Sequence, residues 1–196
     1  MGCGASSHKY EKKNEPVDET LPDHTALKNV KFNSFDDVIA EQKELSNVNE
    51  GTVRLAQIRS VKSIEDHVEK LKLLGRGMSG AVYRARNRNS GREVALKQIN
   101  TNLLSPSSRS LLYSEVHIAL LMDHPHIAKL LEVYSTEDSL ALCSEICEGR
   151  ALLDYVQRAR YLKEAEASCI TRQMCLAVSY MHSSAKLGGQ MCHRDL

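Results

Sequence analysis

The sequence predicts an α+β fold, in which an antiparallel sheet and one long helix precede a second, helical part. Three observations predict it. Residues 74–97 hold a run of glycines, a turn and an alternating segment, which is typical of paired strands. Residues 108–122 repeat apolar side chains at helical spacing, and residues 164–182 do the same. With 196 residues, the chain is long enough for one domain and a tail.

Three closely spaced glycines form the most informative pattern in the chain. Gly75, Gly77 and Gly80 are followed by Val82, and the residues on both sides are apolar or alternate as strands do. Glycine has no Cβ, so the backbone N–H groups of such a loop can come close to a phosphate. We therefore expect a hairpin that carries a phosphate-binding loop.

The hairpin is expected to continue into a third strand that carries a lysine. The turn cluster at 87–91 should reverse the chain, and residues 93–99 then alternate, with Ala95 and Lys97 on one face. A Rossmann fingerprint is set aside because strand-forming residues, rather than a helix, follow the glycines. A Walker loop is set aside because no Gly-Lys-Ser/Thr occurs. A glycine loop with a lysine on the same sheet predicts a clamp for nucleotide phosphates.

The patterns G-x-G-x-x-G-x-V and V-A-x-K together resemble the ATP-binding lobe of protein kinases. The resemblance implies a protein-kinase-like N-lobe, with a sheet and a helix C, and then an incomplete helical C-lobe. It implies ATP and Mg²⁺ as cofactors and a protein as substrate. Residues 123–134 are similar to the corresponding stretch of calcium/calmodulin-regulated and calcium-dependent protein kinases. The ATP-contacting residues that the resemblance implies are Leu74, Gly75, Arg76, Gly77, Met78, Ser79, Gly80, Val82, Ala95, Lys97, Ser144, Glu145 and Cys147.

Glu115 is expected to pair with Lys97. In the helix at 108–122 it shares a face with Leu111, Ile118 and Met122, so its carboxylate falls in an apolar stripe. A buried carboxylate needs a cation, and Lys97 is the natural candidate. The kinase resemblance implies the same pair, with Lys97 holding the α- and β-phosphates. The alternative is a helix rotated so that Glu115 lies in water.

The last four residues, His193-Arg194-Asp195-Leu196, match the opening of the kinase catalytic loop. The resemblance makes Asp195 the group that accepts the proton of the substrate hydroxyl. The magnesium ligands of the family would follow residue 196, so we expect no metal site within the chain. We expect a fragment of a larger serine/threonine protein kinase. The alternative is a membrane-anchored pseudokinase or scaffold that binds nucleotide without catalysis.

Composition argues against several other functions. The formal net charge of +1 is against a nucleic-acid-binding surface. No apolar run approaches the roughly 18 residues of a transmembrane helix. The six cysteines lack zinc-ligand spacing, so reduced thiols of a cytoplasmic protein are expected.

The start of the chain predicts lipidation. Its first six residues fit the N-myristoylation pattern at Gly2, with Cys3 as a palmitoylation site beside it. Two lipids would associate a cytoplasmic protein with a membrane. We expect residues 1–67 to hold this motif, a flexible linker and a short helix, and residues 68–196 to form the partial kinase domain.

Helices are expected at three further places. The one at 34–45 is capped by Ser34 and Asp37 and is expected to lie outside the core. Two more are expected at 152–160 and 164–182. On the last, the residues that predict a buried stripe are Ile170, Met174, Val178 and Met181.

Overall fold

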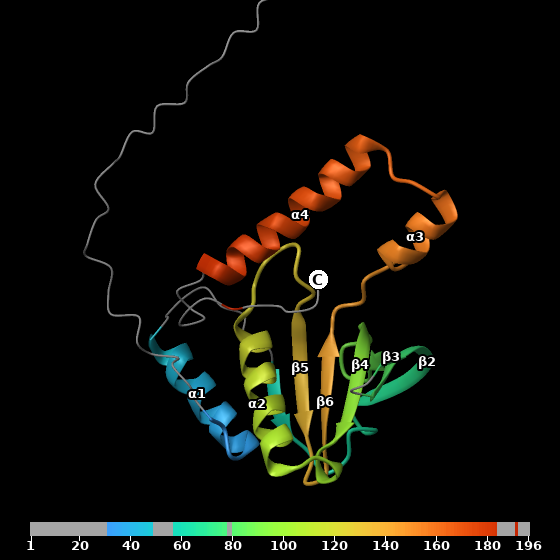
Figure 1. The fold of residues 1–196 in the computed structure, drawn as a ribbon. Coiled ribbons are helices and arrows are strands. Elements are labelled where there is room, and N and C mark those ends of the chain that lie inside the picture. Colours follow the sequence, from blue (N-terminus) through green and yellow to red (C-terminus); the bar gives the residue numbers. More distant parts are fainter. Residues whose placement is uncertain (1–30, 49–56, 78–79, 184–190, 192–196) are drawn as a thin grey trace, which may run out of the picture.

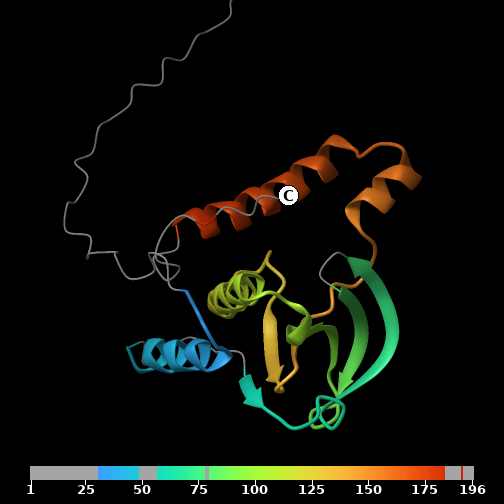
Figure 2. The same cartoon turned by 60° about the horizontal axis from the view of Figure 1, so that its bottom comes forward.

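The computed structural model describes residues 31–48, 57–77, 80–183 and 191 (Figure 1). Within them a single sheet is covered on one face by helix α2, while α3 and α4 lie beyond one end of the strands (Figures 1 and 2). In chain order the elements are α1 (Phe35–Val48), β1 (Gln57–Ser60), β2 (Val68–Gly77), β3 (Gly80–Asn87), β4 (Glu93–Asn100), the 3₁₀ turn η1 (Thr101–Leu103), α2 (Pro106–Leu121), β5 (Leu130–Ser135), β6 (Ser139–Ser144), α3 (Leu152–Ala159) and α4 (Glu164–Ser183).

Six strands form the sheet, in the order β1-β5-β6-β4-β3-β2. Strands β2 to β6 pair antiparallel, as the sequence predicts. Strand β1 instead pairs parallel with β5, with Gln57 opposite Glu132, so the sheet begins well before Val68. The sheet and its helices confirm the predicted α+β class.

The turn between β3 and β4 follows from local hydrogen bonding. The side-chain oxygen of Asn87 accepts bonds from the N–H groups of Asn89 and Ser90, both at 2.9 Å. Gly91 has a φ of +69°, in the left-handed region that glycine tolerates best. The predicted turn at 87–91 is confirmed.

Side chains cap the starts of two helices, and the sequence predicted the first of these caps. At α1, the carboxylate of Asp37 accepts from the N–H of Ser34 at 2.9 Å, and the Ser34 hydroxyl accepts from the N–H of Asp37 at 3.3 Å. At α2, the Ser105 hydroxyl accepts from the N–H of Ser108 at 3.1 Å, and Pro106 opens the helix. The second cap starts α2 two residues earlier than expected.

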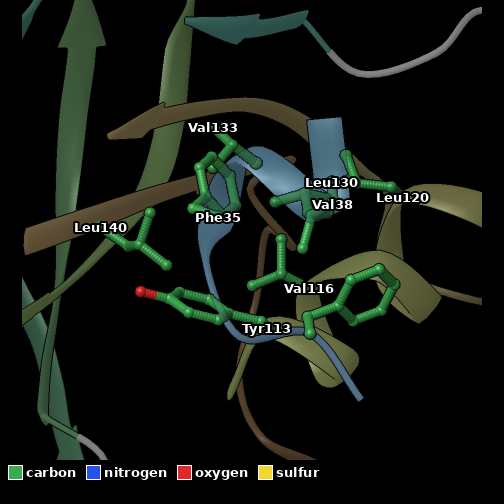
Figure 3. Packing of buried hydrophobic residues seen from close by; sticks show 9 residues of the cluster. Phe35, Val38, Tyr113, Val116, Leu120, Leu130, Val133 and Leu140 are labelled. Carbon is green, nitrogen blue, oxygen red and sulfur yellow. The ribbon is translucent and has the colours of Figure 1, made fainter. Parts of the chain in front are cut away.

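Apolar side chains are buried on both faces of the sheet. On one face, residues of α1, α2, β5 and β6 pack together, and we call this group the α1–α2 cluster (Figure 3). It consists of Phe32, Phe35, Val38, Tyr113, Val116, Leu120, Leu130, Val133 and Leu140. On the other face, the segment before β2 contributes Ile64 to a second cluster. Its other members come from the strands and are Val68, Ala85, Val94, Leu96, Tyr134, Ala141 and Cys143.

The expectation that the first helix lies outside the core is wrong. Helix α1 forms close to the predicted residues, but Phe35 is only 7% exposed and Val38 is 0% exposed. The reason is a second apolar face of α2, formed by Tyr113, Val116 and Leu120, which α1 covers. Burying these side chains gains hydrophobic free energy that a solvated helix would not have.

The buried stripe predicted for the last helix is also wrong in part. Met181 is 5% exposed, but Met174 is 42% exposed. Helix α4 is held near its end, where the Tyr180 hydroxyl accepts a bond from the N–H of Asp123 at 3.1 Å and its ring stacks on His124 at 5.0 Å. None of the described helices has the length and apolar character needed to cross a membrane.

Candidate nucleotide-binding site

The predicted glycine hairpin is formed by the ends of β2 and β3. Gly77 pairs with Gly80 at its tip, and Gly75 pairs with Val82 further along the strands. Gly80 has a φ of +123°, a conformation that residues with a Cβ rarely adopt. A Cβ at Gly75 would meet no atom within 4 Å. The strand ends therefore leave room for a ligand beside the backbone.

Strand register brings the glycine hairpin next to Lys97. Gly75 lies opposite Val82, and Val82 lies opposite Lys97. Lys97 in turn lies opposite Leu142 on β6. Residues directly opposite each other in antiparallel strands have their side chains on the same face of the sheet. The hairpin and the lysine thus share one face of the sheet. Helix α2 packs on the same face, where its side chains are in one cluster with Leu140 of β6.

A second row on this face leads to the hinge. Ala95, two residues before Lys97, lies opposite Arg84 on one side and Ser144 on the other. The Arg84 guanidinium lies 2.6 Å from the carboxylate of Glu93 and 3.2 Å from that of Glu148. Its hydrogen bond to Glu93 raises the pKa of Arg84, so this group stays charged. Arg84 therefore links the middle of the sheet to the segment after β6.

The predicted ion pair between Lys97 and Glu115 is not formed. Lys97 is half-buried, Glu115 is exposed, and among the described residues no ion pair or hydrogen bond joins their side chains. The prediction took the stripe through Glu115 as the buried face of the helix. The structure buries the opposite face, with Tyr113 and Val116, so the carboxylate needs no cation to offset burial.

The hinge follows directly on β6. The backbone N–H of Glu145 donates to the carbonyl of Lys129 at 3.0 Å, and its carboxylate accepts from the N–H of Lys129 at 2.9 Å. These two bonds hold the start of the hinge against β5. Cys147 is exposed, and within the described part of the chain its backbone makes no hydrogen bond. Its N–H and C=O are therefore available to a flat, hydrogen-bonding ligand such as a nucleobase.

A cavity of about 690 Å³ lies between the hinge and α4. Its walls include Met122 at the end of α2, Glu145 and Cys147 of the hinge, and Met174 and Met181 of α4. The sequence pattern on α4 singled out these methionines but predicted burial rather than the wall of a cavity. Their place beside the hinge depends on how α4 is anchored through Tyr180, which periodicity does not show.

Some of the predicted site residues cannot be placed in this site. Leu74 and Arg76 are exposed on β2. Those that lie outside the described residues are Gly2, Cys3, Met78, Ser79 and Asp195. In the ranges that the structure covers, no three His, Cys, Asp or Glu side chains are grouped as a metal site would require.

The fold and this arrangement of strands, hinge and helix can now be compared with known proteins. A family model described as "Protein kinase domain" matches residues 68–196, which is more than half of the chain. The chain belongs to the protein kinase family.

Three curated relatives agree with this assignment. Sperm motility kinase 2B of Mus musculus is 35% identical over 126 residues, which is 64% of this chain and 24% of the relative. Serine/threonine-protein kinase ATG1a of Arabidopsis thaliana is 36% identical over 123 residues, or 63% of this chain and 19% of the relative. Serine/threonine-protein kinase SIK2 of Gallus gallus is 37% identical over 123 residues, which is 63% of this chain and 15% of the relative. The chain thus matches a quarter or less of each of these relatives.

A solved structure supports the fold. The twitchin kinase fragment of C. elegans superposes with a TM-score of 0.58 at 23% identity, covering 68% of this chain and 29% of the other. At this identity the likeness concerns the fold alone.

Two cysteines near the hinge should differ sharply in reactivity. Burial, followed by the nearby Glu132 carboxylate, raises the pKa of Cys143 to about 12. At pH 8 its thiolate fraction is then on the order of 10⁻⁴. Iodoacetamide should alkylate the exposed Cys147 at least about 100-fold faster than Cys143, as followed by peptide mass spectrometry. Protein unfolded in guanidinium is the control, and there the two rates should converge. Equal rates in the folded protein would contradict the burial of β6.

Proposed function

We propose that this chain supplies the ATP-binding part of a serine/threonine protein kinase, which transfers a phosphoryl group from ATP to a protein hydroxyl. One observation carries the proposal. The glycine hairpin and the half-buried, unpaired Lys97 lie in one row on one face of the sheet, within the segment that matches the kinase family. The names of the relatives support the serine/threonine preference.

Different described residues would bind different parts of ATP. Backbone groups of the glycine hairpin would approach the phosphates, and Lys97 would supply the positive charge that stabilises them. The backbone of Cys147 would bind the adenine edge, with Ala95 and Val82 on the sheet beneath the base. Ser144, which precedes the hinge, has a small side chain, which would leave space beside the base. Glu115 would orient Lys97 once α2 brings the two together.

The transfer step involves groups outside this set. Asp195 is proposed to accept the proton of the substrate hydroxyl, on the strength of the H-R-D-L motif. Mg²⁺ would neutralise charge on the phosphates when bound. The described residues do not group ligands for it, so we assign it no site and derive no step through it. The proposed calcium-linked branch of the family rests only on the similarity of residues 123–134.

Lys97→Met tests the proposed ATP site. Removing the cation should abolish the increase in melting temperature that Mg-ATP causes in the unaltered protein, because the phosphates lose their counter-charge. Differential scanning fluorimetry at millimolar nucleotide measures this. Lys62→Met is the matched control, since Lys62 is an exposed lysine in the segment before β2, and it should keep the full shift.

Two outcomes would contradict the ATP site. If Mg-ATP fails to shift the unaltered protein, the described residues do not bind nucleotide. If Lys97→Met shifts as much as Lys62→Met, nucleotide binds somewhere other than the row that contains Lys97.

We also propose that the chain is myristoylated at Gly2 and acylated at Cys3, and that it is a cytoplasmic protein associated with membranes. The support is the sequence motif and its adjacent cysteine. Metabolic labelling with an alkyne-tagged myristate should mark the unaltered protein and leave Gly2→Ala unmarked. Equal labelling of the two would refute the proposal, while Cys3→Ser should retain the myristate and lose membrane binding.

A further inference from the structure

Hinge residues 146–150 are tied to the sheet by one polar contact between described residues. It is the ion pair of Arg84 on β3 with Glu148, in which guanidinium Nη2 lies 3.2 Å from carboxylate Oε1. Within the described ranges, no other hydrogen bond or ion pair joins these hinge residues to a strand. The chain then turns at Gly149, whose φ is +103°, and α3 begins at Leu152. Arg84 therefore makes the last polar contact between the sheet and the hinge before the chain turns toward α3.

The Arg84 side chain is held in place from the other side by Glu93. Both Nε and Nη2 of Arg84 lie 2.6 Å from Oε2 of Glu93. The hydrogen bond from Arg84 lowers the pKa of Glu93, so both groups are charged at neutral pH. The Glu148 side chain is 74% exposed, and an isolated exposed pair contributes little because ordering two long side chains costs entropy. Here Glu93 has already ordered the guanidinium, so its contact with Glu148 costs less entropy than an isolated pair would.

The ion pair closes a ring of contacts around the proposed position of the base. Arg84 lies opposite Ala95, and Ala95 lies opposite Ser144 at the end of β6. From Ser144 the chain leaves the sheet toward α3 and passes through Cys147 and Glu148 (Figure 1). Glu148 then returns to Arg84 through the ion pair. A base that lies on Ala95 and bonds to the backbone of Cys147 would sit within this ring.

We propose that Arg84 is a positioning residue for the nucleotide base. By holding Glu148, it fixes the adjacent backbone of Cys147 at the distance from Ala95 that a base between them requires. This inference rests on the proposed ATP site, because it assigns the backbone of Cys147 to adenine. A direct effect of charge would differ in sign, since Arg84 attracts the triphosphate whereas Glu148 repels it. Loss of Glu148 would then strengthen ATP binding, whereas the positioning role requires that loss of either residue weakens it.

A double-mutant cycle on Mg-ATP affinity tests this, with the 196-residue chain and isothermal titration calorimetry. Arg84→Gln and Glu148→Gln each remove one partner of the ion pair, and each should weaken binding about threefold. The double variant should also bind about threefold more weakly, rather than about ninefold, because both substitutions remove the same contact. Without nucleotide, the melting temperatures of the three variants should stay within about 2 °C of the unaltered chain, since the substituted groups lie at the surface.

Arg86→Gln is the matched control. Arg86 lies on the same strand, and its Nη2 is 3.4 Å from the other carboxylate oxygen of Glu93. It makes no ion pair with Glu148 among the described contacts. Arg86→Gln removes the same charge from the same strand and should change Mg-ATP affinity less than about 1.5-fold.

Three results would overturn the positioning role while leaving the proposed ATP site intact. Unchanged or tighter binding by Glu148→Gln would show that the hinge contact does not support binding. A ninefold loss in the double variant would show that the two residues act independently. A threefold loss in Arg86→Gln would trace the effect to Glu93 and its partners rather than to the hinge. Failure of the unaltered chain to bind Mg-ATP would instead refute the proposed ATP site, and the inference with it.

Discussion

Helix α2 carries apolar side chains on two opposite faces, and much of the architecture follows from where each face is covered. Tyr113, Val116 and Leu120 form one face, which the α1–α2 cluster buries. The other face carries Leu111, which is 66% exposed, together with Glu115. Because the first face is closed by residues that precede the kinase match, the N-terminal segment is part of the structural unit.

The proposed ATP site depends on a second constraint, the register of the strands. Val82 sits opposite Lys97 because β3 and β4 are joined by a tight turn that Asn87 and Gly91 fix. A slip by one residue would move Lys97 to the other face of the sheet. The sheet therefore sets the lysine and the glycine hairpin rigidly, whereas Glu115 comes from a separate element. The position of α2 decides how far Glu115 lies from Lys97, and in this structure no ion pair joins the two side chains.

Local signals were sufficient for much of the fold. The glycine hairpin, the turn at 87–91, the helices and the antiparallel strands are all encoded by short patterns in the chain, and the structure confirms them. The covered face of α2 was not predictable in this way, since Tyr113, Val116 and Leu120 recur at helical spacing as regularly as the stripe through Glu115. Periodicity identifies both faces but not their partners. The burial of α1 and the parallel pairing of the four-residue strand β1 likewise depend on contacts between distant segments.

The most direct test of this architecture is amide hydrogen exchange on the unaltered chain, followed by mass spectrometry of peptides from α1 and α2. If α1 is docked as a structural part of the lobe, its amides should exchange as slowly as those of α2, and both helices should lose protection together as denaturant is added. If the α1 amides exchange at the rate of an unstructured peptide while α2 stays protected, α1 is not docked and is not a structural part of the lobe.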